Sequence, residues 1–487
     1  MSKLLKNFWF VLIMLAACSD DDDNTTPAGD DEDFEFAVEI GDSTIPYIVI
    51  NTRDEAIQNE PKIIADLDIY EEKQKVQSTT IGIEFRGSTS FRLSDKKSYG
   101  IETWDENGND IDLSFFGFPE EEDWILIGNV VNESDGYIFD RTMLYHHIGY
   151  TISREMEVYA SRTKFVELEI NGEYLGVYVF MEKLKRDEER IDITNLTTND
   201  VSGDEVTGGY IIKIDKTSGG DLNLNQPLEY FLTNWDDDAR YNSDISWRSQ
   251  YDIFGETITF PPFDAPYHAN QYLETYFVYE DPTSDQITTE QKAYIQNYID
   301  EFEAALLWDD FETDTRTYTN YIDVNSFVDY FLINEVCRNI DAYRLSTYLT
   351  KDRNGKLKMG PVWDMNIGFD NADNNRIPVD DWVINYNNYV SRDAWMTPFW
   401  WPRLLEDPQF RLAVKARWTI LRSGVMSTSN LQSIVDETAN NLITNGAIDR
   451  NYGRWDAVPA DYLESINSLK AYLENRTDWM DTEISSF

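Results

Sequence analysis

The sequence predicts an α+β protein with a strand-rich first half and a helix-rich second half. Between residues 80 and 215, apolar residues fall in short runs with period-two alternation, as at Ile81, Ile83 and Phe85. Beyond about residue 286 they recur with helical spacing, over 287–306, 323–338, 408–423, 428–444 and 459–484. A block of strands followed by a block of helices is typical of the α+β class.

Within the strand-rich region, four apolar segments are the clearest strand candidates: 124–127, 165–170, 177–181 and 210–214. Asn171-Gly172 separates the second from the third and is typical of a tight hairpin turn. One helix interrupts the strands, because Phe139, Met143 and His147 share a helical face.

The domain organisation follows from these patterns. We expect an N-terminal β segment over 34–79 and a main domain over 80–487. The main domain divides into a β-rich region at 80–215, a polar and aromatic insertion at 216–285, and a helical region at 286–487. A cleft between the β-rich and helical regions is the expected functional site.

Composition excludes several classes of function. Hydrophobic residues make up 41% of the 487 residues, which is enough for a sizeable core. The 90 acidic and 41 basic residues give a net charge of −49, which argues against nucleic acid as a partner because phosphate repels such a surface. The acidic surface is either a solvated exterior or includes loops that hold Ca²⁺ or Mg²⁺. With two cysteines and three histidines, we expect neither a disulfide framework nor a zinc site.

The first residues predict the compartment. Residues 1–17 combine basic residues with a short apolar run and are typical of a signal peptide. Leu15-Ala16-Ala17-Cys18 resembles a bacterial lipobox, in which Cys18 is lipidated; an ordinary signal peptide with a chance cysteine is the alternative. The acidic tether at 18–33 resembles the surface-export signal of Bacteroidetes lipoproteins. We therefore expect an outer-membrane lipoprotein, exposed at the cell surface, that contacts the membrane only through its N-terminal lipid.

The densest group of polar and aromatic residues lies at 334–373. Asp341 follows the end of a predicted helix, and a predicted hairpin formed by 347–350 and 358–362 delivers Asp364. Two carboxylates at the mouths of a hairpin point into the same space, where one can act as a base and the other can hold a metal. Aspartate is also common in turns, so the spacing by itself leaves a purely structural interpretation open.

Several separate motifs, taken in order, resemble the CotH kinase family of spore-coat CotH-like proteins. They are Phe85–Ser90 with Lys96–Tyr99, Trp124–Leu126 with Arg141, Asn171–Glu182, Gly208–Tyr210 with Asp215, and 334–366 with its Asn-x-Asp turn and Trp-Asp pair. The resemblance covers about 80–370, and Trp400-Trp401 and Arg417-Trp418 extend it toward the helical end.

The resemblance implies a bilobal, atypical protein-kinase-like fold with a β-rich N-terminal lobe and a helical C-terminal lobe. The implied reaction transfers the γ-phosphate of ATP, with Mg²⁺ or Mn²⁺, to Ser or Thr of exported or surface proteins. By resemblance, Asp341 takes the role of the catalytic carboxylate and Asp364 that of the metal ligand.

The candidate phosphate-binding residues lie in the first motif. Arg86 and Ser88, with the turn that follows Arg86, can hold phosphates, although a plain hairpin turn is the alternative. Lys97 is the candidate phosphate lysine. Its strand parity with Tyr99 predicts that it faces inward and that Lys96 faces outward; a surface lysine at a sheet edge is the alternative.

Two further residues complete the implied nucleotide site. Arg141 opens the helix expected behind the cleft, and Glu182 ends a strand where a kinase-like hinge meets the adenine. The alternatives are a structural ion pair for Arg141 and a solvated carboxylate for Glu182.

One departure from the kinase pattern keeps other functions open. The position five residues after Asp341, where kinases place a metal-binding Asn, is Ser346, so Asn366 or Asp373 would have to supply the missing ligand. A catalytically weak pseudokinase or an adhesin-like surface binding protein is therefore the main alternative. The many Trp and Tyr residues also allow a carbohydrate-binding surface protein.

Overall fold

The computed structural model describes residues 34–217, 228–371, 376–456 and 461–487. The predicted signal peptide and tether, Cys18 and Asp373 lie outside the described residues. Among the helices that are described, none combines the length and the apolar character needed to cross a bilayer.

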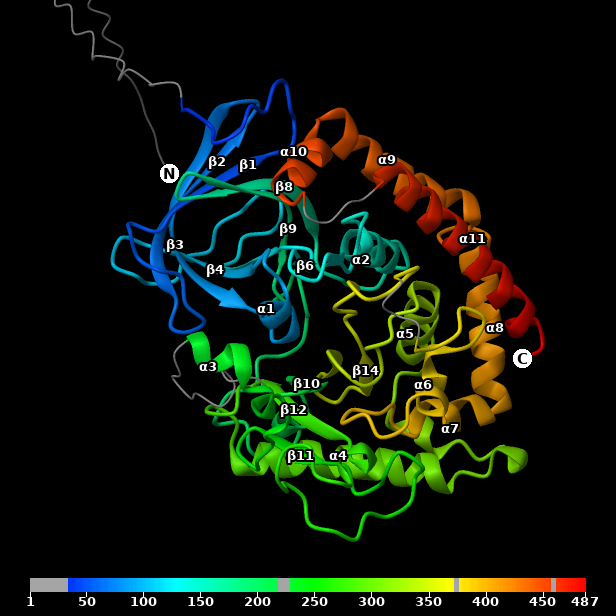
Figure 1. Ribbon diagram of the computed structural model, residues 1–487. Helices are drawn as coiled ribbons and strands as arrows, with labels where there is room; N and C mark the ends of the chain where they lie inside the picture. The colour runs from blue at the N-terminus through cyan, green and yellow to red at the C-terminus, as the bar shows by residue number, and fades with distance from the viewer. Residues whose placement is uncertain (1–33, 218–227, 372–375, 457–460) are drawn as a thin grey trace, which may run out of the picture. The chain divides into compact units, whose positions relative to one another are not determined.

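Seven strands close into a barrel in the order β1-β2-β3-β4-β5-β9-β8 (Figure 1). A parallel pairing of β1 with β8 closes it, whereas the other neighbours pair antiparallel. Alternate residues of each strand fill the interior, with Trp124 and Phe180 at its centre. The strands are β1 (Tyr47–Asn51), β2 (Ile63–Glu71), β3 (Gln74–Arg86), β4 (Ser98–Trp104), β5 (Asp123–Ile127), β8 (Thr163–Ile170) and β9 (Glu173–Glu182).

The barrel includes strands from the expected β segment at 34–79. Its boundary with the main domain falls inside β3, which pairs with both β2 and β4. Ile63, Ala65, Leu67 and Ile69 of β2 are buried in the barrel interior, so this strand cannot be separated from the rest without exposing the core. Residues Ala37–Phe487 accordingly form one unit.

A second, five-stranded sheet has the order β11-β12-β10-β13-β14. Strands β11 and β12 come from the expected insertion at 216–285, and β12 pairs directly with β10. The predicted hairpin is confirmed as β13 and β14. The bounds are β10 (Tyr210–Ile214), β11 (Ser246–Arg248), β12 (Tyr276–Asp281), β13 (Thr347–Lys351) and β14 (Leu357–Met359); β6 (Val131–Asn132) and β7 (Tyr137–Ile138) form a separate pair.

All five helices predicted beyond residue 286 are confirmed. Capping explains several of their starts: Thr288 and Gln291 form a capping box at α4, and Asp323, Asp407, Ser427 and Asp461 cap α5, α8, α9 and α11. The helices are α1 (Thr89–Leu93), α2 (Tyr145–Glu155), α3 (Leu228–Thr233), α4 (Thr289–Trp308), α5 (Val324–Cys337), α6 (Tyr386–Tyr389), α7 (Trp400–Glu406), α8 (Pro408–Arg422), α9 (Thr428–Thr444), α10 (Ala447–Arg454) and α11 (Tyr462–Ser485).

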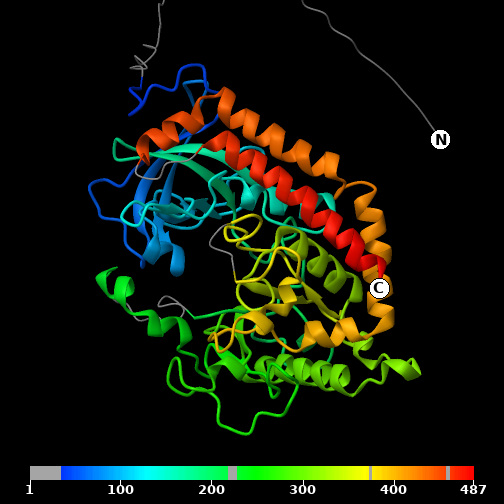
Figure 2. The ribbon, with the colours of Figure 1, turned by 45° about the vertical axis from the view of Figure 1, so that its right-hand side comes forward.

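The last helices connect the helical region to the barrel. Helices α9 and α11 run side by side in both ribbon views, and α10 packs against β9 (Figures 1 and 2). Arg450 of α10 forms an ion pair of 2.5 Å with the buried Glu167 of β8. The chain's C-terminal part therefore braces the barrel formed by its N-terminal part.

The buried Glu303 of α4 predicts a pH dependence of stability. Its carboxyl accepts hydrogen bonds from Ser249 Oγ at 2.7 Å and Trp400 Nε1 at 2.8 Å, and burial raises its pKa from 4.5 to about 8. The folded protein thus holds this proton up to a higher pH than the unfolded chain does. Its contribution to stability is full below pH 4.5 and is lost as the pH rises toward 8.

We expect Glu303→Gln to flatten that slope, which is at most about 1.4 kcal/mol per pH unit. The measurement is the free energy of unfolding by denaturant at pH 5, 6, 7 and 8, compared with wild type. Glu301→Gln, a change at an exposed position of the same helix, is the control. Equal slopes for wild type and Glu303→Gln would contradict the prediction.

Candidate functional site

Two chambers that share part of their lining lie beside the barrel, and the second sheet contributes to the lining of one of them. The barrel chamber has a volume of about 340 Å³ and is lined by residues of β3, β4 and β5, by Lys213 of β10, and by loops that include Asp215 and Asp364. The loop chamber has a volume of about 530 Å³ and is lined by α1 and the chain before it, by the segment at the end of β5, and by the loops that contain Asp341 and Asn366. Both chambers share a junction formed by Arg86, Gly87, Ser88, Lys216, Ser346, Trp363 and Asp364. Some of the candidate site residues line these chambers, and others lie outside them.

Asp364 lies at the junction, just after β14. Its φ is +48°, a left-handed conformation that is uncommon for a non-glycine residue and is often retained at functional sites. Ser346 Oγ donates a hydrogen bond of 3.0 Å to its Oδ2. Burial raises the pKa of Asp364, and the positive charge of Arg86 opposes that rise. The carboxylate is thus half-buried, oriented by one hydroxyl and exposed to a nearby cation.

Asp341 lines the loop chamber, in the turn between α5 and β13. Arg344 Nη2 contacts its Oδ1 at 2.5 Å. The Arg344 side chain is almost fully buried and also donates to the carbonyl oxygens of Ile340 and Trp395. Oδ2 of Asp341 makes no hydrogen bond with the described residues. Asp341 therefore presents one oxygen held in place and a second that is open to a ligand.

Ser346, just before β13, contacts the carboxylates of Asp364 and Asp215. Its φ of +45° is left-handed, like that of Asp364. Its hydroxyl contacts Asp364, and its backbone N–H lowers the pKa of Asp215. Burial outweighs that effect and raises the pKa of Asp215 to about 6. Three carboxylates, of Asp215, Asp341 and Asp364, thus face the two chambers.

Arg86 and Ser88 both line the junction, but their side chains differ in what they contact. Arg86 Nη1 is buried and has no hydrogen-bond partner among the described residues. Ser88 Oγ, in contrast, is held by the buried Asp238 at 2.8 Å and by Arg92 Nη1 at 2.7 Å. Of these two side chains, Arg86 offers an unused donor to a ligand at the junction, and Ser88 does not.

The predicted orientations of Lys96 and Lys97 are wrong. Lys96 is 1% exposed, and its Nζ donates to Val177 O and Asn451 Oδ1, whereas Lys97 is half-buried and donates to Phe91 O at 2.6 Å. Strand parity does not apply, because β4 begins only at Ser98. Lys97 lines neither chamber.

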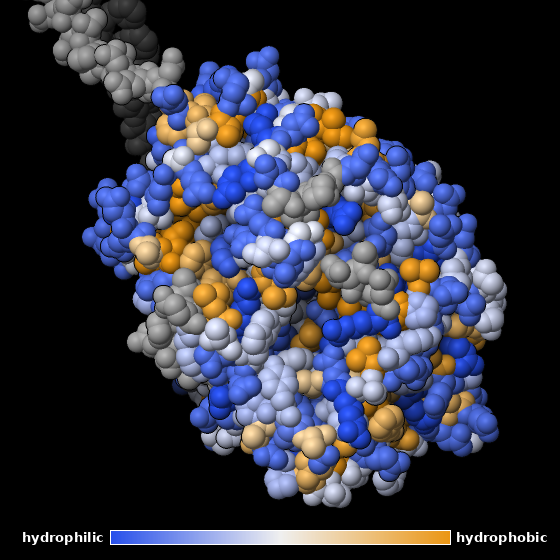
Figure 3. Space-filling model, viewed as in Figure 1, coloured by the Kyte–Doolittle hydropathy of each residue, from blue (hydrophilic) through white to orange (hydrophobic). Residues whose placement is uncertain are grey.

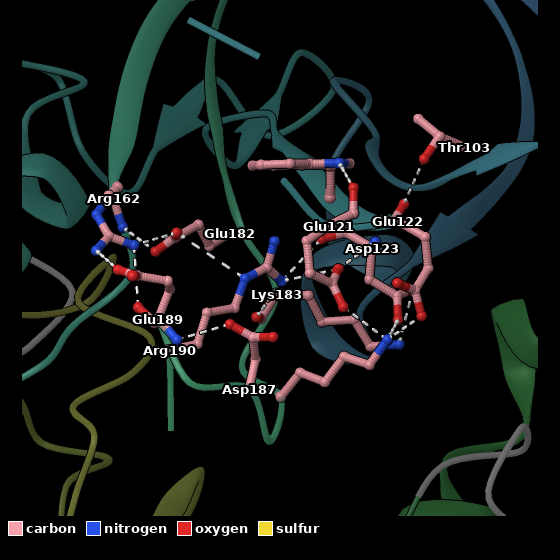
Figure 4. A network of polar contacts seen from close by, with 12 residues as sticks. Thr103, Glu121, Glu122, Asp123, Arg162, Glu182, Lys183, Asp187, Glu189 and Arg190 are labelled. Atoms are coloured by element: carbon pink, nitrogen blue, oxygen red, sulfur yellow. Dashed lines mark hydrogen bonds and ion pairs between the residues drawn. The ribbon is translucent and has the colours of Figure 1, made fainter. Parts of the chain in front are cut away.

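Arg141 and Glu182 also lie outside the chamber linings. Arg141 is exposed, ahead of α2. Glu182 is fully buried and accepts from Arg162 Nη1 at 2.6 Å and from the Arg162 backbone N–H at 2.8 Å (Figure 4). Glu182 is therefore a buried ion-pair partner at the end of β9, and the alternative of a solvated carboxylate is wrong.

Several residues suit a hard divalent cation, which prefers oxygen ligands. Asp364 and Asp215 offer carboxylates, Ser346 offers a hydroxyl, and the half-buried Asn366 adds an amide in the loop chamber. The chemistry of this donor set fits Mg²⁺ or Mn²⁺ better than a soft metal.

A second acidic group lies at the start of β5, where Glu121, Glu122 and Asp123 bring their carboxylates together (Figure 4). Lys185 forms ion pairs with all three, and Arg190 contacts Glu121 at 3.2 Å. Because protein ammonium and guanidinium groups already neutralise these carboxylates, the group is a structural network in this structure.

Sequence reasoning missed Lys216 as a site residue and named Asp215 only as part of a motif. Lys216 lines both chambers, and Asp215 lines the barrel chamber. The adjacent Asp-Lys at the end of a predicted strand was the available signal. Asp215 and Lys216 are site residues because β10 ends at the cleft, and the sequence pattern does not reveal where this strand ends in space.

Comparison with known protein families identifies the family of this chain. A family model described as CotH kinase protein matches residues 83–480. The match covers most of the chain, so the chain belongs to the CotH kinase family and is a kinase-like protein. A search of curated proteins finds no match.

Proposed function

We propose that this chain is an atypical, metal-dependent protein kinase that transfers the γ-phosphate of ATP to Ser or Thr of exported or surface proteins. One observation carries the proposal: Asp341 and Asp364, from the two ends of one β-hairpin, face connected chambers of the same cleft. Phosphoryl transfer needs a bound nucleotide, a metal and a carboxylate near the acceptor hydroxyl, and this arrangement provides a place for each. Membership of the CotH kinase family supports it.

The chambers divide the two substrates. The barrel chamber, with backbone from β4 and β5 and cations near Asp364, suits the nucleotide. The loop chamber, which contains Asp341, suits the segment that carries the acceptor hydroxyl. A divalent cation bound at Asp364 would neutralise charge on the phosphates.

The roles of the protein's own groups follow from their contacts. Arg344 holds Oδ1 of Asp341, so Oδ2 is free to accept a hydrogen bond from the acceptor hydroxyl and to take its proton. The Ser346 hydroxyl keeps Asp364 in one orientation at the junction. The half-buried site reduces competition from water and strengthens each charge interaction.

A specific observation favours a second candidate function. Ser346, at the position where kinases have a metal-binding Asn, uses its hydroxyl on Asp364 and is a weaker metal ligand than an amide. A catalytically weak pseudokinase or adhesin-like binding protein would tolerate this. Purified chain that binds ATP with Mn²⁺ but labels no protein with radioactive phosphate would support this alternative.

Replacing Asp341 tests the chemistry. We expect Asp341→Asn to lower the phosphorylation rate by roughly 10²–10⁴-fold with little change in nucleotide affinity, because a general base acts mainly in the transition state. Rate, calorimetric affinity and melting temperature are measured on the same preparation. A mutant with a lower melting temperature and a full rate per folded molecule would show that Asp341 only stabilises its turn.

Replacing Asp364 tests the metal. We expect Asp364→Asn to weaken Mn²⁺-dependent ATP binding at least roughly tenfold, a loss of about 1.4 kcal/mol. The fold should persist, because burial already disfavours the charged form of Asp364 and Asn can still accept from Ser346. Asp314→Asn, at a side chain that is 91% exposed, is the control. Equal affinities for wild type and Asp364→Asn, with and without metal, would refute the assignment.

We also propose that the chain is an outer-membrane lipoprotein, anchored through Cys18 and exposed at the cell surface. The support is the lipobox-like Leu15–Cys18 followed by Asp20–Asp23. We expect Cys18→Ala to move the protein from the membrane fraction to the soluble fraction on cell fractionation. Retention of the mutant in the membrane fraction would exclude the lipid anchor.

A further inference from the structure

Lys216 brings a positive charge to the junction of the two chambers. Its Nζ donates a hydrogen bond of 2.6 Å to Thr89 Oγ1 and lies 3.6 Å from Asp238 Oδ2. The ammonium of Lys216 and the guanidinium of Arg86 both counteract the raised pKa of Asp364. Two cations therefore act on the same half-buried space.

The insertion holds Lys216 in this position. The residue after it, Thr217, donates through its backbone N–H to Asp238 O at 2.8 Å and through Oγ1 to Asp237 O at 2.5 Å. The residue before it, Asp215, accepts at its carbonyl from Tyr241 Oη at 2.7 Å. The chain on both sides of Lys216 is thus tied to 237–241, which fixes where the ammonium can reach.

The nearby carboxylate of Asp238 is already engaged. Arg92 Nη1 contacts both of its oxygens at 2.9 Å, and Ser88 Oγ contacts both at 2.8 Å. Both Arg92 and Asp238 are almost fully buried. Lys216 is therefore a second cation for Asp238 and lies farther from it than Arg92 does. Asp238 neutralises the charge of Lys216 only in part.

Arg86 brings a second positive charge to the junction. Its Nη1 is buried without a hydrogen-bond partner among the described residues, and its guanidinium lies 5.7 Å from the Trp363 ring centroid. A buried donor without an acceptor is costly, and an anion at the junction would supply the missing acceptor.

We propose that Lys216 and Arg86 together bind the polyphosphate of a nucleoside di- or triphosphate at the junction. The insertion at 216–285 thereby supplies the phosphate lysine that sequence reasoning assigns to Lys97. The identity of the nucleoside part rests on the proposed function, whereas the polyphosphate site does not. Asp215 and Asp364 face the same space, where a divalent cation held by their carboxylates would screen their charge from the anion.

Calorimetry with the purified full-length chain and Mn²⁺ tests the proposal, using ATP, ADP, adenosine and inorganic tripolyphosphate as probes. We expect Lys216→Met to weaken ATP and tripolyphosphate roughly 10- to 100-fold, because charge-assisted hydrogen bonds are lost, and to leave adenosine unchanged. Lys216→Arg should restore part of the affinity. Lys164→Met, at an exposed position of β8, is the inert control, and Lys97→Met represents the competing assignment.

The outcomes separate this proposal from the kinase function. Wild-type binding of ATP and tripolyphosphate that is lost in Lys216→Met, without transfer of phosphate to any protein, supports the polyphosphate site and contradicts the kinase. Unchanged ATP and tripolyphosphate affinity in Lys216→Met overturns the proposal, and so does a loss seen in Lys97→Met instead. Failure of wild type to bind tripolyphosphate overturns it as well. A lower melting temperature for Lys216→Met with intact phosphate binding assigns Lys216 a structural role only.

Discussion

A buried ion pair between Glu335 of α5 and Arg476 of α11 holds together the loops that form the site. Both side chains are fully buried, and Arg476 Nη2 lies 3.0 Å from Glu335 Oε2. Burial raises the pKa of Glu335 to about 7. Burying such a pair is costly unless its remaining hydrogen bonds are satisfied. Here Glu335 also accepts from Tyr343 Oη and from the N–H groups of Val383 and Ile384. The Asp341 turn and the 383–384 segment are thereby tied to two helices.

From that anchored turn, short side-chain contacts orient the two key carboxylates. Arg344 holds Asp341, and Ser346 holds Asp364 across the β13–β14 hairpin. Left-handed backbone at Ser346 and Asp364 places these side chains toward the cleft. The relative position of the two carboxylates is therefore set by a short stretch of chain that the helical region supports. The barrel supplies the cation Arg86 at the junction, and the 216–285 region supplies Lys216.

The part of the site that was predictable is local in sequence. Asp341 and Asp364 flank one hairpin, so turn and strand patterns were sufficient to bring them together. The lysines were not predictable in this way. Lys96 is buried because Asn451, 355 residues away, accepts from its ammonium, and Lys216 matters because β10 ends at the cleft. The periodicity of a short segment does not predict which residues far away in the chain it will contact.

The sequence by itself determined the α+β class, the five C-terminal helices and the hairpin flanked by both aspartates, because each depends on residues close to one another along the chain. Only the tertiary structure decided that 47–71 completes a closed barrel and that β12 joins the second sheet beside β10. Strand pairing across long chain separations depends on which edges meet when the core is buried, and alternation within one strand does not specify its neighbour.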